Sequence, residues 1–247
     1  MDADVLILSA GFGARLRPLT DSLPKPLIEV AGKRLIERNL ELIARAGAKE
    51  VFINLHYLKE KIRDFVGDGS TWGLHVRFVE EPVILDTGGA IKNIEPWLQH
   101  EQLVTINADV IVGPDFNISD VLRRHVQNPE HPLITMVLRS DSKAVEYGEL
   151  GVDAGGRVVS FSGHTYRPGL WRRGLMFSGI QVISRKVLEH MPPRGEVFSI
   201  TRKTIRDILE NQGIIASYEY LGYWTDVGTP ERLEEASKQL SQSLGIP

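Results

Sequence analysis

The chain has 247 residues, 42% of them hydrophobic and 25% charged, which suits one large α/β domain or two small ones. A net charge of −3 gives no basic surplus for nucleic acid or membrane surfaces, and the absence of cysteine excludes disulfides and thiolate metal sites. The acidic start, Met1 to Asp4, is unlike a signal peptide, and no apolar run approaches about 18 residues. We therefore expect a cytoplasmic protein without a membrane span.

The first predicted element is a buried strand at residues 5–8 that runs directly into a glycine loop. Gly11 and Gly13 permit backbone shapes and close approaches that a Cβ would block. Backbone N–H groups in such a loop can point at an anion, and two cations, Arg15 and Lys25, follow. The pattern predicts a polyphosphate site, and the alternative is a tight strand-to-helix turn without a ligand.

Two better-known phosphate-binding loops do not fit this segment. The P-loop pattern Gly-x-x-x-x-Gly-Lys-Ser/Thr does not occur in the chain. The dinucleotide fingerprint requires a third glycine at the position that Leu16 occupies. The two glycines alone therefore leave the ligand of the loop open.

Strands and helices alternate after the loop. Residues 27–30 form a short apolar segment. The predicted elements after it are a helix at 35–46, a strand at 51–55, a helix from 58 to near Gly67 and a strand at 74–78. In the first helix, Ile36, Leu40 and Ile43 share one face, and Gly47 suits the position after its end. This order predicts a Rossmann-like, mostly parallel sheet flanked by helices on both faces, with ligands beyond the carboxyl ends of the strands.

A second glycine pair lies in the segment 85–91, where a helix is expected to begin. Gly88 and Gly89 let the backbone approach another group closely. A linker capped by Asp86 or Thr87 explains the same residues without a ligand. Seen alone, the segment favours that structural interpretation.

A buried strand at 103–106 ends in Asn107, Ala108 and Asp109. A carboxylate at the tip of a central strand rarely serves packing, because buried charge is unfavourable unless it is paired or bound to a metal. Asp109 is therefore a candidate metal ligand. An aspartate that caps a loop is the alternative.

The second half of the chain is less regular, and we find no internal repeat or long linker in it. The predicted elements are a strand at 133–138, a hairpin around 154–156, a strand at 176–182, a helix at 199–209 and a strand at 214–221. Thr229 as N-cap and Pro230 at the first helical position begin a terminal helix. Asp226 again follows a strand, and capping does not explain it.

Three motifs together resemble those of the sugar-1-phosphate nucleotidyltransferases, the nucleotide-sugar pyrophosphorylases. The first is Gly-x-Gly-x-Arg-Leu-x-Pro-Leu-Thr at residues 11–20, followed by Pro-Lys-Pro-Leu at 24–27. The other two are Asn-x-Asp at 107–109 and Trp-x-Asp-Val-Gly-Thr-Pro at 224–230, which resemble the two metal motifs of the family. They occur in the family's order and span most of the chain.

The resemblance implies a single nucleotidyltransferase domain over residues 1–247, with no room for a further acyltransferase domain. Residues 1–130 would form the nucleotide-binding part. Residues 131–247 would form the smaller, mixed part that binds the sugar and supplies the second metal ligand. The expected partners are a nucleoside triphosphate and a sugar 1-phosphate, with no nucleic acid or membrane, and the chain would act as a monomer or homodimer.

The resemblance also implies residue roles. The loop would hold the nucleoside triphosphate, with Arg15 at its β and γ phosphates, Lys25 near the reacting phosphates, and Mg²⁺ on Asp109 and Asp226. The implied catalytic residues are Arg15, Lys25, Asp109 and Asp226. The implied nucleotide-binding residues are Ala10, Gly11, Phe12, Gly13, Ala14, Arg15, Glu81 and Gly88, and the implied sugar-binding residues are Thr87, Asn107, Gly148 and Gly179.

The sequence departs from the family pattern at two places. Ala108 stands where many members have glycine, which leaves Asp109 in register. Many members follow the hairpin with Glu-Lys-Pro, whose lysine touches the sugar phosphate, but residues 160–164 are Ser-Phe-Ser-Gly-His. Nearby cations are candidates to replace it, although a solvated basic loop is the simpler interpretation; they are His164, Arg167, Arg172 and Arg173.

Within the family, the chain looks most like the N-acetylmuramate-1-phosphate uridylyltransferases of cell-wall recycling, which use UTP. The basis is Asp-Thr-Gly-Gly-Ala-Ile at 86–91, Asn-x-Asp-Val at 107–110, Phe-Ser-Gly-Ile at 177–180 and the missing Glu-Lys-Pro. A mannose- or heptose-1-phosphate guanylyltransferase using GTP is the main alternative, and a cytidylyltransferase is a third. A catalytically silent regulatory subunit is the alternative from another class.

Overall fold

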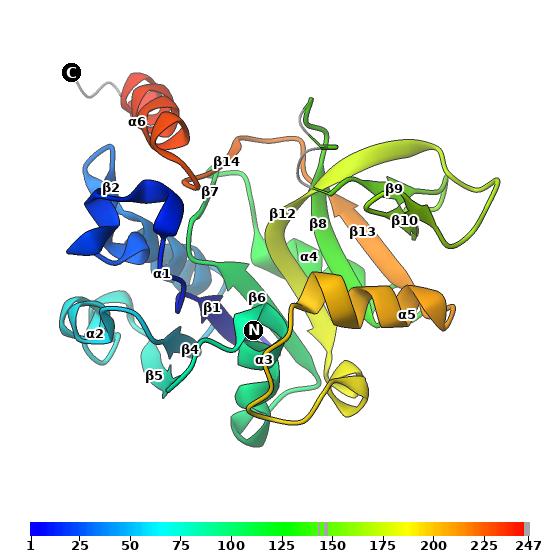
Figure 1. Ribbon diagram of the computed structural model, residues 1–247, viewed down its shortest axis with the longest axis horizontal. Helices are drawn as coiled ribbons and strands as arrows, with labels where there is room; N and C mark the ends of the chain where they lie inside the picture. Colours follow the sequence, from blue (N-terminus) through cyan, green and yellow to red (C-terminus); the bar gives the residue numbers. More distant parts are fainter. Residues whose placement is uncertain (143, 146–147, 245–247) are drawn as a thin grey trace.

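The computed structural model describes residues 1–142, 144–145 and 148–244, and in this part of the chain a ten-stranded mixed sheet forms the centre (Figure 1). Its strands are β1 (Asp4–Leu8), β4 (Glu50–Leu55), β5 (His75–Glu80), β6 (Gln102–Asn107), β8 (Ile134–Arg139), β9 (Leu150–Val152), β10 (Val158–Phe161), β11 (His164–Thr165), β12 (Arg173–Ser184) and β13 (Ile215–Glu219). Their order is β11-β10-β9-β12-β6-β1-β4-β5, and β8 pairs with both β12 and β13.

The parallel half of the sheet comes from the first half of the chain. β6, β1, β4 and β5 run parallel, as the alternation of strands and helices predicted. The long strand β12 then lies antiparallel to β6, β8 and β9, while β13 is parallel to β8. The Rossmann-like, mostly parallel architecture is confirmed, and the later strands make the sheet mixed.

Helices cover both faces of the sheet, which was also predicted. They are α1 (Leu35–Arg45), α2 (Lys59–Val66), α3 (Asp86–Asn93), α4 (Ile118–Val126), α5 (Arg206–Glu210) and α6 (Pro230–Leu244). α1 and α2 pack on one face, where Ile43 and Ile62 join Ile7 in a buried cluster. α3 packs on the other face, where Ile91 joins Leu6. Within the described residues, no helix combines the length and apolar character needed to cross a bilayer.

The predicted end of the first helix and the predicted start of the last helix are confirmed. The helices between them differ in part from the prediction. Gly47 follows α1 in a left-handed conformation with φ of +80°, and α6 begins at Pro230. The expected helix at 199–209 is a π-helical turn, Ile200–Ile205, that continues into α5. α4 was not predicted, although Asn117 caps it by accepting a hydrogen bond from Ser119 N. Neither Asp86 nor Thr87 is an N-cap, because α3 begins at Asp86 with Leu85 before it.

The terminal helix packs against the segment that follows the glycine loop. Leu16, Ile28 and Val30 form a third buried cluster with Val227 and Ala236. Two pairs of short strands lie outside the central sheet. β7 (Val110–Val112) pairs with β14 (Trp224–Asp226), and β2 (Glu29–Val30) pairs with β3 (Lys33–Arg34). β14 and the start of α6 are thereby brought to the carboxyl edge of the parallel strands, where β6 leads into β7.

Candidate active site

Two neighbouring cavities lie at the carboxyl edge of the parallel strands, where Leu8 of β1 pairs with Asn107 of β6. The loop cavity, of about 440 Å³, is lined by Ser9, Ala10, Gly11, Lys25, Asn54 and Glu81, among others. The strand cavity, of about 330 Å³, is lined by Arg15, Ser178, Gly179, Gln181, Ser199, Thr201 and Asp226, among others. Both are lined by Leu8, Asp86, Thr87, Asn107 and Asp109, so they adjoin along a shared wall.

The glycine loop adopts the tight turn that its sequence predicts. Gly13 has φ of +65° and begins a single 3-10 turn, and a Cβ at this position would lie 2.9 Å from Thr20 Cγ2. Thr20 Oγ1 donates to Gly13 O at 2.9 Å, which fixes the turn. No atom lies within 4 Å of a Cβ built on Gly11, so the backbone borders open space there. Gly13 is thus required for the turn, whereas Gly11 leaves a free approach.

The predicted nucleotide-binding residues of the loop divide into two groups. Ala10 and Gly11 line the loop cavity, whereas Phe12, Gly13 and Ala14 line neither cavity. Phe12 is 46% exposed and its ring packs edge-on against those of His56 and Tyr57, with centroid distances of 5.6 and 5.4 Å. The part of the loop at the cavity is therefore its first half.

Asp109 lies just beyond β6 and forms an ion pair with Lys25, one of the cations predicted from the loop motif. Its segment is held by the main chain and by Asn39, since Ala108 N donates to Leu8 O at 3.1 Å and Asn39 Nδ2 donates to Ala108 O at 3.2 Å. Ala108 itself is buried. Alanine in place of the common glycine therefore fits, and Asp109 faces both cavities.

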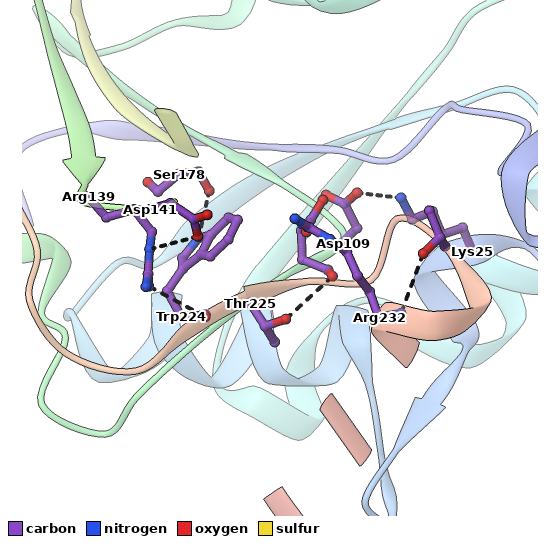
Figure 2. A network of polar contacts seen from close by, with 10 residues as sticks. Lys25, Asp109, Arg139, Asp141, Ser178, Trp224, Thr225 and Arg232 are labelled. Atoms are coloured by element: carbon purple, nitrogen blue, oxygen red, sulfur yellow. Dashed lines mark hydrogen bonds and ion pairs between the residues drawn. The ribbon is translucent and has the colours of Figure 1, made fainter. Parts of the chain in front are cut away.

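Asp226 reaches the same place through β14. β14 pairs antiparallel with β7, with Asp226 opposite Val110, and Val227 N donates to Asp109 O at 3.0 Å. The Asp226 carboxylate forms an ion pair with Arg232 in the first turn of α6. In Figure 2 the side chains of Lys25, Asp109 and Arg232 lie close together. Two carboxylates that lie far apart in the sequence thus share the strand cavity, each with a cation beside it.

This donor set fits Mg²⁺. Magnesium is usually bound through one or two carboxylates together with water and substrate phosphates, rather than by a cage made only of protein ligands. Asp109 and Asp226 supply two carboxylates, and no cluster of three or more His, Cys, Asp or Glu side chains suited to a metal occurs among the described residues. A metal held here would take its remaining ligands from phosphate and water.

Arg15 is exposed at the rim of the strand cavity, beside Gly228. A Cβ on Gly228 would lie 3.0 Å from Arg15 Nη2 and 3.1 Å from Asp226 Oδ2. Glycine at this position therefore leaves room for both the Arg15 guanidinium and the Asp226 carboxylate. The glycine of the Asp-Val-Gly-Thr-Pro motif was part of the resemblance, but its spatial role was not predicted.

Glu81 is buried in the wall of the loop cavity, and both of its oxygens accept hydrogen bonds. The donors are Asn54 Nδ2 at 2.8 Å and Leu85 N at 3.0 Å. Burial raises the pKa of the Glu81 carboxyl above its usual value, against the opposing effect of these two bonds. Asn54 Oδ1 in turn accepts from Ser9 N at 2.7 Å, so the network reaches the glycine loop. Asn54 was missed because it lies within an otherwise apolar strand, one residue before its end.

Thr87 and Gly88 secure the start of α3. Thr87 Oγ1 accepts from Ile200 N at 3.0 Å and lines both cavities. Gly88 N donates to Phe198 O at 2.9 Å, and a Cβ on Gly88 would lie 2.3 Å from Phe198 Cε2. The close approach at Gly88 is therefore to the protein, and Gly88 lines neither cavity.

The other predicted sugar-binding residues are divided. Asn107 and Gly179 line the strand cavity, and Gly179, with φ of +85°, would place a Cβ 2.9 Å from Asn107 Nδ2. Gly148 lines neither cavity. Of the cations considered as replacements for the missing lysine, Arg173 pairs with Glu219, and none lines either cavity; they are His164, Arg167, Arg172 and Arg173. The solvated basic loop is the interpretation that the structure favours.

Residues 4–243 match the family described as Nucleotidyl transferase. The chain therefore belongs to this family, that of the sugar-1-phosphate nucleotidyltransferases, as its motifs indicated. It is 35% identical over 245 residues to N-acetylmuramate alpha-1-phosphate uridylyltransferase of Neisseria meningitidis, covering 94% of this chain and 95% of that protein. It is 32% identical over 243 residues to mannose-1-phosphate guanylyltransferase of Mycobacterium tuberculosis, covering 98% of this chain but 65% of that protein.

Solved structures share the fold. HddC from Yersinia pseudotuberculosis, complexed with GMP-PN, superimposes with a TM-score of 0.78 at 24% identity, covering 96% of this chain and 99% of that one. A putative glucose-1-phosphate thymidylyltransferase from Bacillus anthracis gives a TM-score of 0.81 at 19% identity, covering 96% and 94%. At these identities the likeness establishes the architecture.

Proposed function

We propose that this protein joins UTP to N-acetylmuramate 1-phosphate, giving a UDP-sugar and pyrophosphate. The observation that carries the reaction type is that Arg15, Lys25, Asp109 and Asp226 line two adjoining cavities. Asp109 lies in the wall that both cavities share, Lys25 lines the loop cavity, and Arg15 and Asp226 line the strand cavity. The observation that favours these substrates is the similarity to the Neisseria uridylyltransferase, which extends over nearly the full length of both chains. A protein that consumes a nucleoside triphosphate is expected to act in the cytoplasm.

Each cavity suits one reactant. The loop cavity, with Ala10, Gly11 and the Glu81 network, would receive the nucleoside triphosphate, and the strand cavity, with Thr87 and Asn107, would receive the sugar 1-phosphate. The loop cavity is built almost entirely from residues of the 1–130 part. The strand cavity draws on both 1–130 and 131–247, which agrees with a second part that adds the sugar site.

The reaction needs positioning and charge neutralisation more than proton transfer. An oxygen of the sugar phosphate forms a bond to the α-phosphorus, and the bond from that phosphorus to the bridging oxygen breaks as pyrophosphate leaves. The attacking phosphate monoester is already ionised near neutral pH, so no general base is required. Arg15 offers several donors in one plane to the leaving pyrophosphate, and Lys25 offers a point charge to the reacting phosphates.

Asp109 and Asp226 would hold Mg²⁺, which supplies charge neutralisation at the phosphates when it is bound. The chain's own residues arrange these ligands in advance. The hydrogen bond from Val227 N to Asp109 O joins the two segments, and Lys25 and Arg232 orient the two carboxylates.

A guanylyltransferase that uses GTP with mannose or heptose 1-phosphate is the second candidate. The similarity to the mycobacterial mannose-1-phosphate guanylyltransferase, at 32% identity, favours it. The chain spans only 65% of that protein, so the similarity leaves a large part of the relative unmatched.

The test is pyrophosphate release with Mg²⁺, with UTP, GTP, CTP, ATP and dTTP each combined with N-acetylmuramate, N-acetylglucosamine, glucose, mannose and manno-heptose 1-phosphates. Turnover with UTP and N-acetylmuramate 1-phosphate is the expected result. Turnover restricted to GTP with mannose or heptose 1-phosphate would favour the second candidate. Nucleotide binding without turnover of any pair would contradict both and indicate a regulatory subunit.

A further inference from the structure

Two buried polar side chains of β12, Ser178 and Gln181, have polar atoms without a partner. Each residue is 1% exposed, and neither Ser178 Oγ nor Gln181 Oε1 has a hydrogen-bond partner within the described part of the chain. Buried polar atoms are nearly always hydrogen-bonded, because leaving one unpaired is unfavourable. A pair of exceptions on one strand calls for a physical reason.

Both side chains line the strand cavity, beside the candidate catalytic residues. The main-chain oxygen of Ser178 has a partner, because Trp224 Nε1 donates to it at 2.9 Å (Figure 2). The side-chain hydroxyl of Ser178 is the group without one. Gln181 pairs with Thr105 of β6, two residues before Asn107. At a strand rise of about 3.3 Å per residue, Gln181 lies roughly 7 Å further along the sheet from the cleft edge than Asn107.

The charges of this cavity lie elsewhere. Its charged lining residues among those described are Arg15, Asp86, Asp109 and Asp226, and all of them come from the loops and element ends at the carboxyl edge. The same cavity is also lined by two neutral polar residues at the start of the π-helical turn, its N-cap Ser199 and Thr201. The sugar phosphate would bind at this edge, through Arg15 and the Mg²⁺ that Asp109 and Asp226 would hold, and a neutral polar group fits the inner end.

We infer that Gln181, supported by Ser178, is a specificity-determining contact to the sugar ring of the sugar 1-phosphate. Gln181 Oε1 is an acceptor, so it selects a neutral hydrogen-bond donor, a ring hydroxyl or an acetamido N–H. The inference rests on the proposed nucleotidyl transfer, and it adds which part of the sugar substrate the protein recognises.

The first experiment replaces the amide by an apolar side chain of similar shape, Gln181→Met. We expect the KM for the sugar 1-phosphate to rise about tenfold and the KM for the nucleoside triphosphate to stay unchanged, because only the sugar loses a hydrogen bond. Gln102→Met is the matched control. Gln102 Oε1 is also buried without a partner, but Gln102 lies at the opposite end of β6 and lines neither cavity, so its KM values should match the wild type.

The second experiment identifies the donor with a series of sugar 1-phosphates, each lacking one hydroxyl or the acetamido group. The wild type should lose efficiency with the analogue that lacks the donor, and Gln181→Met should show no further loss with that analogue. Ser178→Ala, the smaller change, is measured in parallel and should raise the same KM by a smaller factor. Thermal unfolding should show both variants as stable as the wild type, since an unpaired atom is removed.

The outcomes separate this inference from the proposed function. Turnover of no sugar 1-phosphate by the wild type would overturn the proposed function. An active wild type with unchanged sugar KM in both Gln181→Met and Ser178→Ala would overturn only the inference. A tenfold loss that is equal for every deoxy analogue, with lowered thermal stability, would also overturn it, because it would indicate a packing role.

Discussion

The two cavities differ in how their polar groups are used. In the wall of the loop cavity, Ser9, Asn54 and Glu81 bond to one another, and both oxygens of Glu81 accept hydrogen bonds. In the strand cavity, Ser178 and Gln181 keep polar atoms without a partner among the described residues. The contrast indicates that the loop cavity is a prearranged scaffold around a backbone loop. The strand cavity instead offers side chains to an incoming molecule.

The largest expected effect lies where the two cavities meet. Asp109→Asn and Asp226→Asn should each lower Mg²⁺-dependent turnover by about a hundredfold or more, because each removes one charge that holds the ion against the phosphates. Turnover is measured by pyrophosphate release, with circular dichroism to check the fold. Asp120→Asn, at a partly exposed position of α4 that lines neither cavity, is the control. Wild-type activity in either variant would remove that residue from the metal site.

The second prediction compares polar networks directly. Asn54→Ala should lower the free energy of unfolding by about 3 kcal/mol, because it leaves buried Glu81 and Ser9 each short of a partner. Ser178→Ala should change it by less than about 0.5 kcal/mol, because its hydroxyl has no partner to lose. Urea unfolding measures both. Equal losses would show that the two cavities are built alike.

The third prediction concerns the wall between β12 and β6. Gly179→Ala should destabilise the protein by about 2 kcal/mol, since alanine is strained at φ of +85° and its Cβ would crowd Asn107. Gly32→Ala is matched for backbone conformation, with φ of +76°, but nothing lies within 4 Å of its Cβ, so it should cost about 1 kcal/mol. The difference between the two variants isolates the crowding. Identical losses of stability would show that Asn107 moves aside for the added methyl group without lowering the free energy of unfolding.

The smallest expected effect is the pH dependence of the loop-cavity network. Burial raises the pKa of Glu81 above its usual value of 4.5, so just above pH 4.5 the folded protein keeps a proton that the unfolded chain has already lost. Stability from this group is therefore present below that pH and falls as the pH rises through the folded-state pKa. Glu81→Gln should remove this contribution, which urea unfolding at a series of pH values would detect. An unchanged pH profile would contradict the assignment.

A buried histidine provides a control of opposite sign in the same measurements. His125 lies between Thr135 Oγ1 and Ser184 Oγ, and burial lowers its pKa to about 4. As the pH drops below about 6.5, His125 of the unfolded chain binds a proton, whereas His125 of the folded protein stays neutral. The free energy of unfolding therefore falls as the pH drops from about 6.5 toward 4. His125→Gln should remove this second slope and leave that of Glu81 intact.

The sequence by itself determined the parallel half of the sheet, the glycine turn and the family. Each of these features depends on a short stretch of sequence. Apolar periodicity indicates the strands and helices, glycines indicate the turns, and Lys25, Asp109 and Asp226 each lie within a short motif. The sequence also predicted that the carboxyl ends of the parallel strands lie at one edge, where ligands bind, whereas the pairing of β1 with β6 at that edge came from the structure.

Only the tertiary structure decided which side chains meet. Asp226 reaches Asp109 through the pairing of β14 with β7, which the sequence did not predict. The start of α6 was predicted, but the ion pair of its Arg232 with Asp226 was not. Asn54 and Gln181 sit in strands that read as ordinary core, and their surroundings come from other segments. Local pattern specifies the elements, whereas contacts between distant segments depend on the packing of the whole chain, and that packing forms the cavities.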